Sequence, residues 1–144
     1  MNAIPGWFYL AILAAIFAAL TAIFAKIGLE GVDADYATLI RTLVIVLLLG
    51  IYVTAMGKWV NPATLSKKSL LFLLLSGIAA CASWLFYFRA LKLGDAAKVA
   101  PVDKLSLVLV AIFASLFLNE KLAVKDWTGI LLIVGGIILL GLKK

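Results

Sequence analysis

Four polar residues stand inside long apolar stretches of the sequence, where a charge is costly unless it has a use. Arg41 lies in one such stretch, and Asp103, Lys104 and Ser106 lie together in another. A charged side chain at the centre of a bilayer costs about 2.5–3.5 kcal/mol on the insertion scale, so each charge either reaches an interface or serves a purpose. A guanidinium that faces a water-filled cavity can hold a carboxylate or phosphate in its planar fork.

Each of these charges also has a structural explanation. Arg41 is five residues into its apolar stretch, about 7.5 Å along a helix, so its long side chain can snorkel to the interface. Asp103 and Lys104 are adjacent and point about 100° apart on a helix, so we expect that they do not pair with each other. Asp103 either forms an interhelical ion pair, with Arg41 as a candidate partner, or belongs to a substrate or proton site.

Three further residues can complete a site around these charges. Pro101 removes one backbone hydrogen bond and frees the carbonyl of Ala97, as in the broken helices of membrane transporters, although a plain kink explains it equally. Trp84 and Tyr87, three residues apart on one helix face, either belong to an interfacial aromatic belt or line a cavity with Arg41. The predicted substrate-binding residues are Arg41, Trp84, Tyr87, Asp103, Lys104 and Ser106, with Pro101 as a helix break.

The elements that must position these residues are long and apolar. The chain has 144 residues, 66% of them hydrophobic and 14% charged, unlike a soluble domain. Five apolar runs have about the length of a bilayer-spanning helix, and none alternates like a barrel strand. The runs are 7–28, 36–56, 69–91, 96–118 and 127–142. We therefore predict an all-α integral membrane protein, a bundle of five transmembrane helices in a single domain over 1–144.

The composition also excludes several classes of function. The sequence has no histidine and a single cysteine, Cys81, which removes imidazole catalysis, His-rich metal sites and internal disulfides. It has no G-x-x-x-x-G-K-[ST] phosphate loop, so we expect no enzyme activity, no metal and no cofactor. The net charge of +6 in so apolar a chain indicates lysines and arginines at lipid headgroups rather than bound nucleic acid.

The closing motifs resemble a known family. The segment FLNEKL (117–122), Trp127-x-Gly129 and the pair Gly135-Gly136 are similar to the end of the EamA domain in the drug/metabolite transporter superfamily. Arg41 early in the second run and the segment WLFYFRAL (84–91) agree with it. The segment VAPVDKLS (99–106) resembles a short five-helix microbial subgroup, with Pro101 instead of the proline that the family often carries near Leu107. The resemblance covers nearly the whole chain.

The resemblance implies one half of a ten-helix, inverted-repeat transporter. Longer members contain two such domains in opposite orientation around a cavity that opens alternately to each side. We expect an antiparallel homodimer that moves small metabolites such as amino acids by alternating access. It would lie among the lipids of the cytoplasmic (inner) membrane and be gradient-driven or facilitative. The alternatives are a lipid or lipid-linked sugar flippase and a non-transporting partner subunit, in which Arg41, Asp103 and Lys104 only pair with each other.

Loop charges predict that the chain inserts in both orientations. Five spans place the two termini on opposite sides, and the loops 57–68 and 119–126 on the side of Met1 carry five lysines. The other side carries six lysines and arginines at or beyond the ends of the spans, with Arg41 and Lys104 left out of the count because they lie within spans. Because orientation follows the asymmetry of these residues, a near tie favours dual insertion.

This prediction is tested by labelling. In a Cys81→Ser background, one new cysteine at Asn2 or at Lys144 is treated in intact cells with a membrane-impermeant thiol reagent. Dual insertion gives about half labelling at both positions, since the positive-inside bias is nearly absent. Full labelling at one position and none at the other contradicts it and points to a parallel assembly or a separate partner chain.

Overall fold

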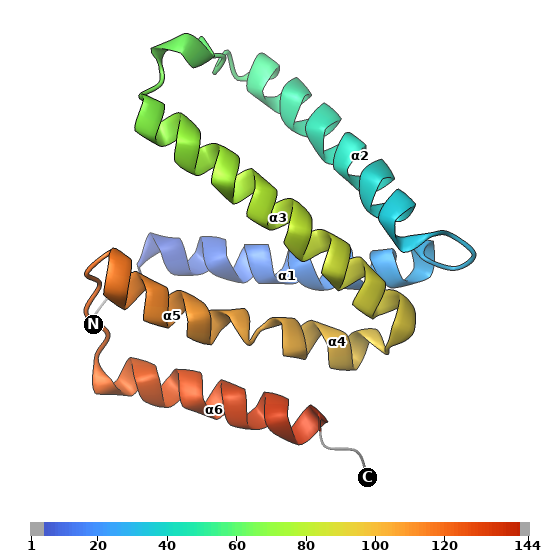
Figure 1. Cartoon of the computed structure of the whole chain (residues 1–144), viewed down its shortest axis with the longest axis vertical. Coiled ribbons are helices and arrows are strands. Elements are labelled where there is room, and N and C mark those ends of the chain that lie inside the picture. Colours follow the sequence, from blue (N-terminus) through green and yellow to red (C-terminus); the bar gives the residue numbers. More distant parts are fainter. Residues whose placement is uncertain (1–4, 142–144) are drawn as a thin grey trace. The chain divides into compact units, whose positions relative to one another are not determined.

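The computed structural model describes residues 5–141, and within them the chain is helical with no strand (Figure 1). The elements are α1 (Gly6–Gly28), α2 (Ala34–Ala55), the 3-10 turn η1 (Pro62–Thr64), α3 (Lys67–Leu93), α4 (Ala96–Asp103), α5 (Ser106–Phe117) and α6 (Val124–Gly141). By length and composition, α1, α2, α3 and the segment Ala96–Phe117 can each cross a bilayer. The 18 residues of α6 extend about 27 Å, and α6 is the fifth apolar helix. The predicted all-α membrane class is confirmed.

The helix predicted over 96–118 is interrupted. α4 ends at Asp103 and α5 begins at Ser106. Between them the Lys104 amide donates to the carbonyl of Pro101 at 2.9 Å, and the Leu105 amide donates to Val102 at 3.0 Å. These are i to i+3 bonds, so the backbone tightens into a 3-10 turn. The segment Ala96–Phe117 is apolar enough to cross a bilayer, so the apolar pattern predicted one span, and Pro101 alone indicated a helix break within it.

The chain divides into two compact units, Met1–Leu93 and Gly94–Lys144. In the first unit α3 packs against both α2 and α1, and η1 lies in the connection between α2 and α3 (Figure 1). In the second unit α6 runs back along α5 and α4 and contacts both of them (Figure 1). The first unit contains Arg41, Trp84 and Tyr87, whereas Asp103, Lys104 and Ser106 belong to the second.

Polar contacts join the ends of the three helices in the first unit. Lys26, in the last turn of α1, donates from Nζ to the carbonyl of Leu91 at 2.7 Å. Lys92, in the last turn of α3, donates to the carbonyl of Val32 at 2.7 Å. The last carbonyls of a helix have no partner within it, so Lys26 satisfies a group that lipid cannot. Leu91 itself is fully buried.

The start of α2 is fixed by a local sequence signal. Gly31 has a φ of +71°, a left-handed conformation that glycine adopts without a steric penalty and that turns the chain after α1. Asp33 follows as the N-cap, and its Oδ1 accepts from the amides of Asp35 at 2.9 Å and Tyr36 at 3.1 Å. Because of this cap α2 begins at Ala34, two residues before the predicted start.

Removing this cap should destabilise the first unit. We expect Asp33→Ala to lower the free energy of unfolding by about 1 kcal/mol, since two amides at the start of α2 lose their acceptor. Asp33→Asn keeps a side-chain oxygen and should stay close to the native protein. The measurement is unfolding of purified protein in mixed micelles with increasing denaturing detergent. Equal losses in both variants would show that the charge, and not the cap, stabilises α2.

Candidate substrate-binding site

The guanidinium of Arg41 lies against aromatic rings of α3. Its Cζ is 4.3 Å from the centroid of the Trp84 ring and 5.5 Å from that of Phe88. A guanidinium within about 6 Å of a ring centroid is attracted by the negative face of the ring, an interaction of about 0.5–2 kcal/mol that grows as water is removed. Trp84 and Phe88 are four residues apart, so they present adjacent rings on one face of α3.

Arg41 points toward the aromatic rings of α3. It is the eighth residue of α2, about 10 Å from the start of that helix. The adjoining end of α3 is at Leu93, and Trp84 lies about 13 Å from it along the helix. The guanidinium is closer to Trp84 than to Phe88, and thus to the deeper of the two rings.

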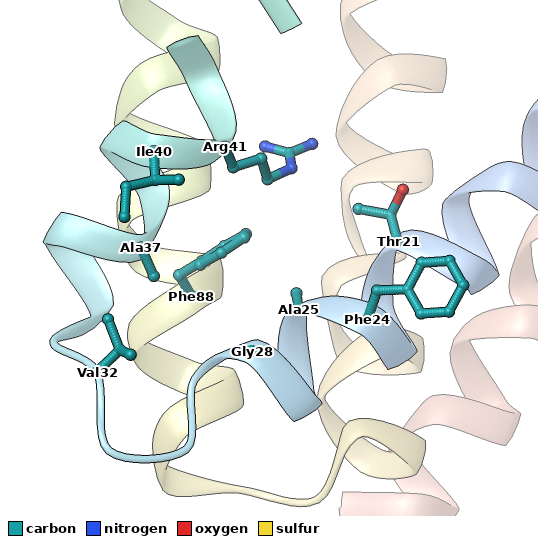
Figure 2. A pocket seen from close by; sticks show the side chains of 9 residues that line it. All are labelled: Thr21, Phe24, Ala25, Gly28, Val32, Ala37, Ile40, Arg41 and Phe88. Atoms are coloured by element: carbon teal, nitrogen blue, oxygen red, sulfur yellow. The ribbon is translucent and has the colours of Figure 1, made fainter. Parts of the chain in front are cut away.

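A cavity of about 390 Å³ opens beside this arginine, within the about 300–1,000 Å³ usual for small-molecule sites. Figure 2 shows Arg41 extending from α2 across the space toward Thr21 of α1, with the ring of Phe88 beside it. The lining residues come from α1, the α1–α2 loop, α2 and α3, and are Thr21, Phe24, Ala25, Gly28, Val32, Ala37, Ile40, Arg41 and Phe88. Arg41 is the one charged residue among them.

The guanidinium is incompletely satisfied where it lies. Its Nη1 is buried and has no hydrogen-bond partner among the described residues. A buried donor without a partner costs about 1–3 kcal/mol, and more when it is charged. An acceptor that enters the cavity would remove this cost, and a carboxylate or phosphate matches the fork best. Within residues 5–141 no group of three or more His, Cys, Asp or Glu side chains is placed to hold a metal ion.

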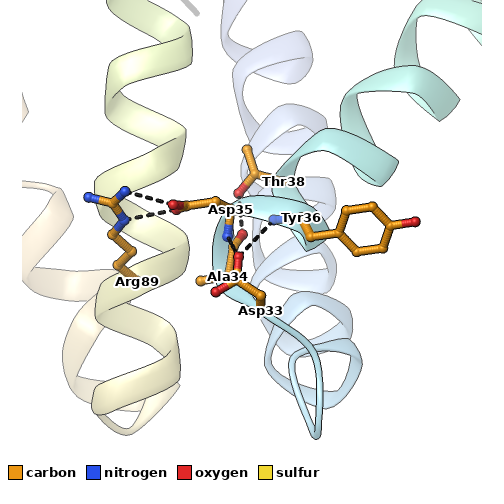
Figure 3. A network of polar contacts seen from close by, with 6 residues as sticks. All are labelled: Asp33, Ala34, Asp35, Tyr36, Thr38 and Arg89. Atoms are coloured by element: carbon orange, nitrogen blue, oxygen red, sulfur yellow. Dashed lines mark hydrogen bonds and ion pairs between the residues drawn. The ribbon is translucent and has the colours of Figure 1, made fainter.

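A separate ion pair fixes α2 to α3 about two turns before Arg41. Arg89 donates from Nε to Asp35 Oδ1 at 2.8 Å and from Nη2 to Oδ2 at 2.7 Å (Figure 3). This two-bond geometry restricts the rotation of α3 about its own axis relative to α2. Arg89 and Phe88 are neighbours on α3, so the pair also helps to hold the Phe88 ring at the cavity.

The second unit places its polar residues at the helix interruption. Pro101 lies inside α4, Lys104 caps the end of α4, and Ser106 begins α5. The prediction that Asp103 and Lys104 do not pair is wrong, because Lys104 Nζ lies 3.2 Å from Asp103 Oδ2. The expected 100° separation applies to side chains that stand straight out from a regular helix. Here α4 ends at Asp103, and the flexible stem of Lys104 bends back to the carboxylate.

Phe88 was not among the predicted site residues. The three-residue spacing predicted Trp84 with Tyr87, whereas the rings over Arg41 are Trp84 and Phe88. Tyr87 packs edge-on against Phe88, with ring centroids 6.4 Å apart. Spacings of three and four residues both place side chains on one helix face, so the WLFYFRAL segment allowed either pair. Thr21 carried no signal, since a lone threonine in an apolar helix is common.

Long apolar helices indicate a multi-pass membrane protein, and comparison with known proteins identifies its class. The EamA-like transporter family matches residues 5–142, and the chain belongs to this family of membrane transporters.

Two curated relatives align over nearly their full length. An "uncharacterized transporter in cobO 3'region" from Sinorhizobium sp. is 55% identical over 135 residues, covering 94% of this chain and 96% of the relative. An uncharacterized protein of Methanocaldococcus jannaschii is 29% identical over 135 residues, with the same coverage of 94% and 96%. No solved structure matches the chain.

The Asp35–Arg89 pair predicts a charge-reversal experiment. Asp35→Arg alone and Arg89→Asp alone should each lower the melting temperature in detergent, because each places like charges side by side. The double variant restores opposite charges at the same two positions and should recover most of the loss. A double variant no more stable than the worse single variant would show that the pair does not hold α2 to α3.

Proposed function

We propose that the chain is a transporter of small metabolites that carry a carboxylate, amino acids among them, and that it works by alternating access as a homodimer in the cytoplasmic membrane. The observation that carries the proposal is the Arg41 guanidinium, held on two aromatic faces beside a cavity, with Nη1 unpartnered. Structural arginines within membranes are ordinarily paired with an anion. Arg41 has no such anion among the described residues and lies beside a cavity in a member of a transporter family, which supports a role in cargo binding.

The number of apolar helices supports a dimer. Within residues 5–141 there are four candidate spans and a fifth apolar helix, α6. An odd number of spans reverses the orientation between the two ends. Two copies inserted in opposite directions are related by a two-fold axis in the membrane plane, which makes the inward-open and outward-open states equivalent. We therefore favour the antiparallel homodimer over a parallel one.

The interruption between α4 and α5 supports a second polar contact with cargo. Broken helices in transporters expose backbone groups near the bilayer midplane, where cargo binds. Asp103, Lys104 and Ser106 stand at such an interruption. Because Lys104 already neutralises much of the Asp103 charge at 3.2 Å, we assign these residues to polar contacts with the cargo and not to ionic ones.

A lipid flippase is the second candidate. The observation that favours it is the cavity wall, whose lining residues other than Thr21 and Arg41 are apolar. A flippase would hold a lipid phosphate at Arg41 and pass acyl chains alongside the helices. It predicts redistribution of a labelled lipid between leaflets of proteoliposomes that contain this protein alone, with no flux of water-soluble metabolites.

Transport by purified protein tests the proposal. In proteoliposome counterflow with radiolabelled amino acids, Arg41→Gln should reduce exchange about ten- to hundredfold, since a hydrogen bond to a charged group is worth about 1.5–3 kcal/mol. As a control, Lys68→Gln also removes one positive charge, but at the start of α3, and it should leave exchange unchanged. Exchange at the native rate in Arg41→Gln would contradict the proposal. Absence of exchange by the native protein alone would also contradict it and would favour a non-transporting partner subunit.

A further inference from the structure

The cavity beside Arg41 carries one sign of charge. Its nine lining residues include this arginine and no aspartate or glutamate. The acidic residues at the start of α2 are engaged elsewhere, because Asp33 caps the helix and Asp35 holds Arg89. A ligand in this cavity therefore meets a single positive charge and no negative one from the lining residues.

The remaining polar capacity of the cavity is small. The hydroxyl of Thr21 donates to the carbonyl of Phe17 at 2.8 Å, so its oxygen is left to accept. The Trp84 and Phe88 rings attract the charge of the guanidinium, and its buried Nη1 remains free to donate to an acceptor. The rest of the lining is aliphatic or aromatic, and it comprises Phe24, Ala25, Gly28, Val32, Ala37, Ile40 and Phe88.

From this arrangement we propose a substrate class for the cavity: monoanionic carboxylates with an apolar, uncharged body, bound in preference to the zwitterion of the same skeleton. The inference rests on the proposed function and deepens it, since it ranks members of the carboxylate class. The ammonium of an amino acid must leave water for a wall that offers no anion, which is costly. A carboxylic acid of the same skeleton gains the same contact with Arg41 without that cost.

Three compounds with one skeleton separate the charges. The probes are 3-phenylpropionate, L-phenylalanine and 2-phenylethylamine, titrated by calorimetry into the full chain in phosphatidylcholine nanodiscs. We expect 3-phenylpropionate to bind at least about tenfold more tightly than phenylalanine, and phenylethylamine to give no heat of binding. Equal affinity of the first two, or binding of the amine, overturns the proposal.

Variants connect the preference to the cavity. Arg41→Gln should abolish binding of 3-phenylpropionate, and Arg41→Lys should weaken it, because an ammonium lacks the planar fork. Lys68→Gln, at the start of α3, should bind 3-phenylpropionate as tightly as the native protein does. Melting temperatures of all three variants establish folding, and the ranking of probes on the native chain stands even if Arg41→Gln does not fold. Native binding by a folded Arg41→Gln overturns the assignment.

Two further arms distinguish other outcomes. Nanodiscs that contain phosphatidylglycerol offer a competing anionic headgroup, and a loss of 3-phenylpropionate binding there would assign the cavity to a lipid phosphate and overturn the small-molecule proposal. Counterflow with the same probes separates this inference from the proposed function. Selective binding of 3-phenylpropionate without any flux would refute transport and leave the proposed substrate class of the cavity intact. Flux without preference for 3-phenylpropionate over phenylalanine would support transport and overturn the proposed substrate class.

Discussion

Polar contacts between helix ends hold the first unit together, and its cavity depends on them. Lipid is as apolar as a leucine side chain, so burying one helix against another gains little from the hydrophobic effect. Lys26 on the carbonyl of Leu91, Lys92 on the carbonyl of Val32, and Arg89 on Asp35 each join segments distant in sequence. Together they hold the end of α3 against the end of α1 and the start of α2. These three segments form the walls of the cavity beside Arg41.

Arg41 lies against two aromatic rings, and its buried Nη1 has no hydrogen-bond partner among the described residues. Two rings attract its charge but give its N–H groups nothing to donate to in the hydrogen-bonding plane. The guanidinium is therefore stable enough to stay within the helix layer and still gains by meeting an anion. A carboxylate partner from the protein would have made the site more stable and less responsive to cargo.

In the second unit, the charged residues within the apolar segment are stabilised in a different way. Asp103 and Lys104 neutralise each other at the point where the regular helix stops. A 3-10 turn there carries the backbone from α4 to α5 with its amides still bonded, through i to i+3 bonds. The apolar segment can therefore remain long enough to cross a bilayer while it presents polar groups along its course.

Much of the fold was determined by the sequence itself, because a bilayer ties helix length and apolar composition directly to the spans. The five apolar runs and the arginine early in α2 were identified from the sequence without any structure. So was the family resemblance, which the EamA match over residues 5–142 confirms. Each of these depends on residues near one another in the chain.

Only the tertiary structure decided which helix faces meet. Spacing along one helix shows which residues share a face, but it does not give the rotation of one helix against another. Trp84 beside Arg41 was therefore one of two interpretations, and neither Phe88 beside Arg41 nor the Asp35–Arg89 pair could be predicted in advance. Pro101 indicated a helix break, but a plain kink explained it equally, and the sequence did not place the end of α4 at Asp103. Hydropathy averages over a segment, whereas the exchange of i+4 for i+3 bonds is decided by a few backbone angles and by the side chains around them.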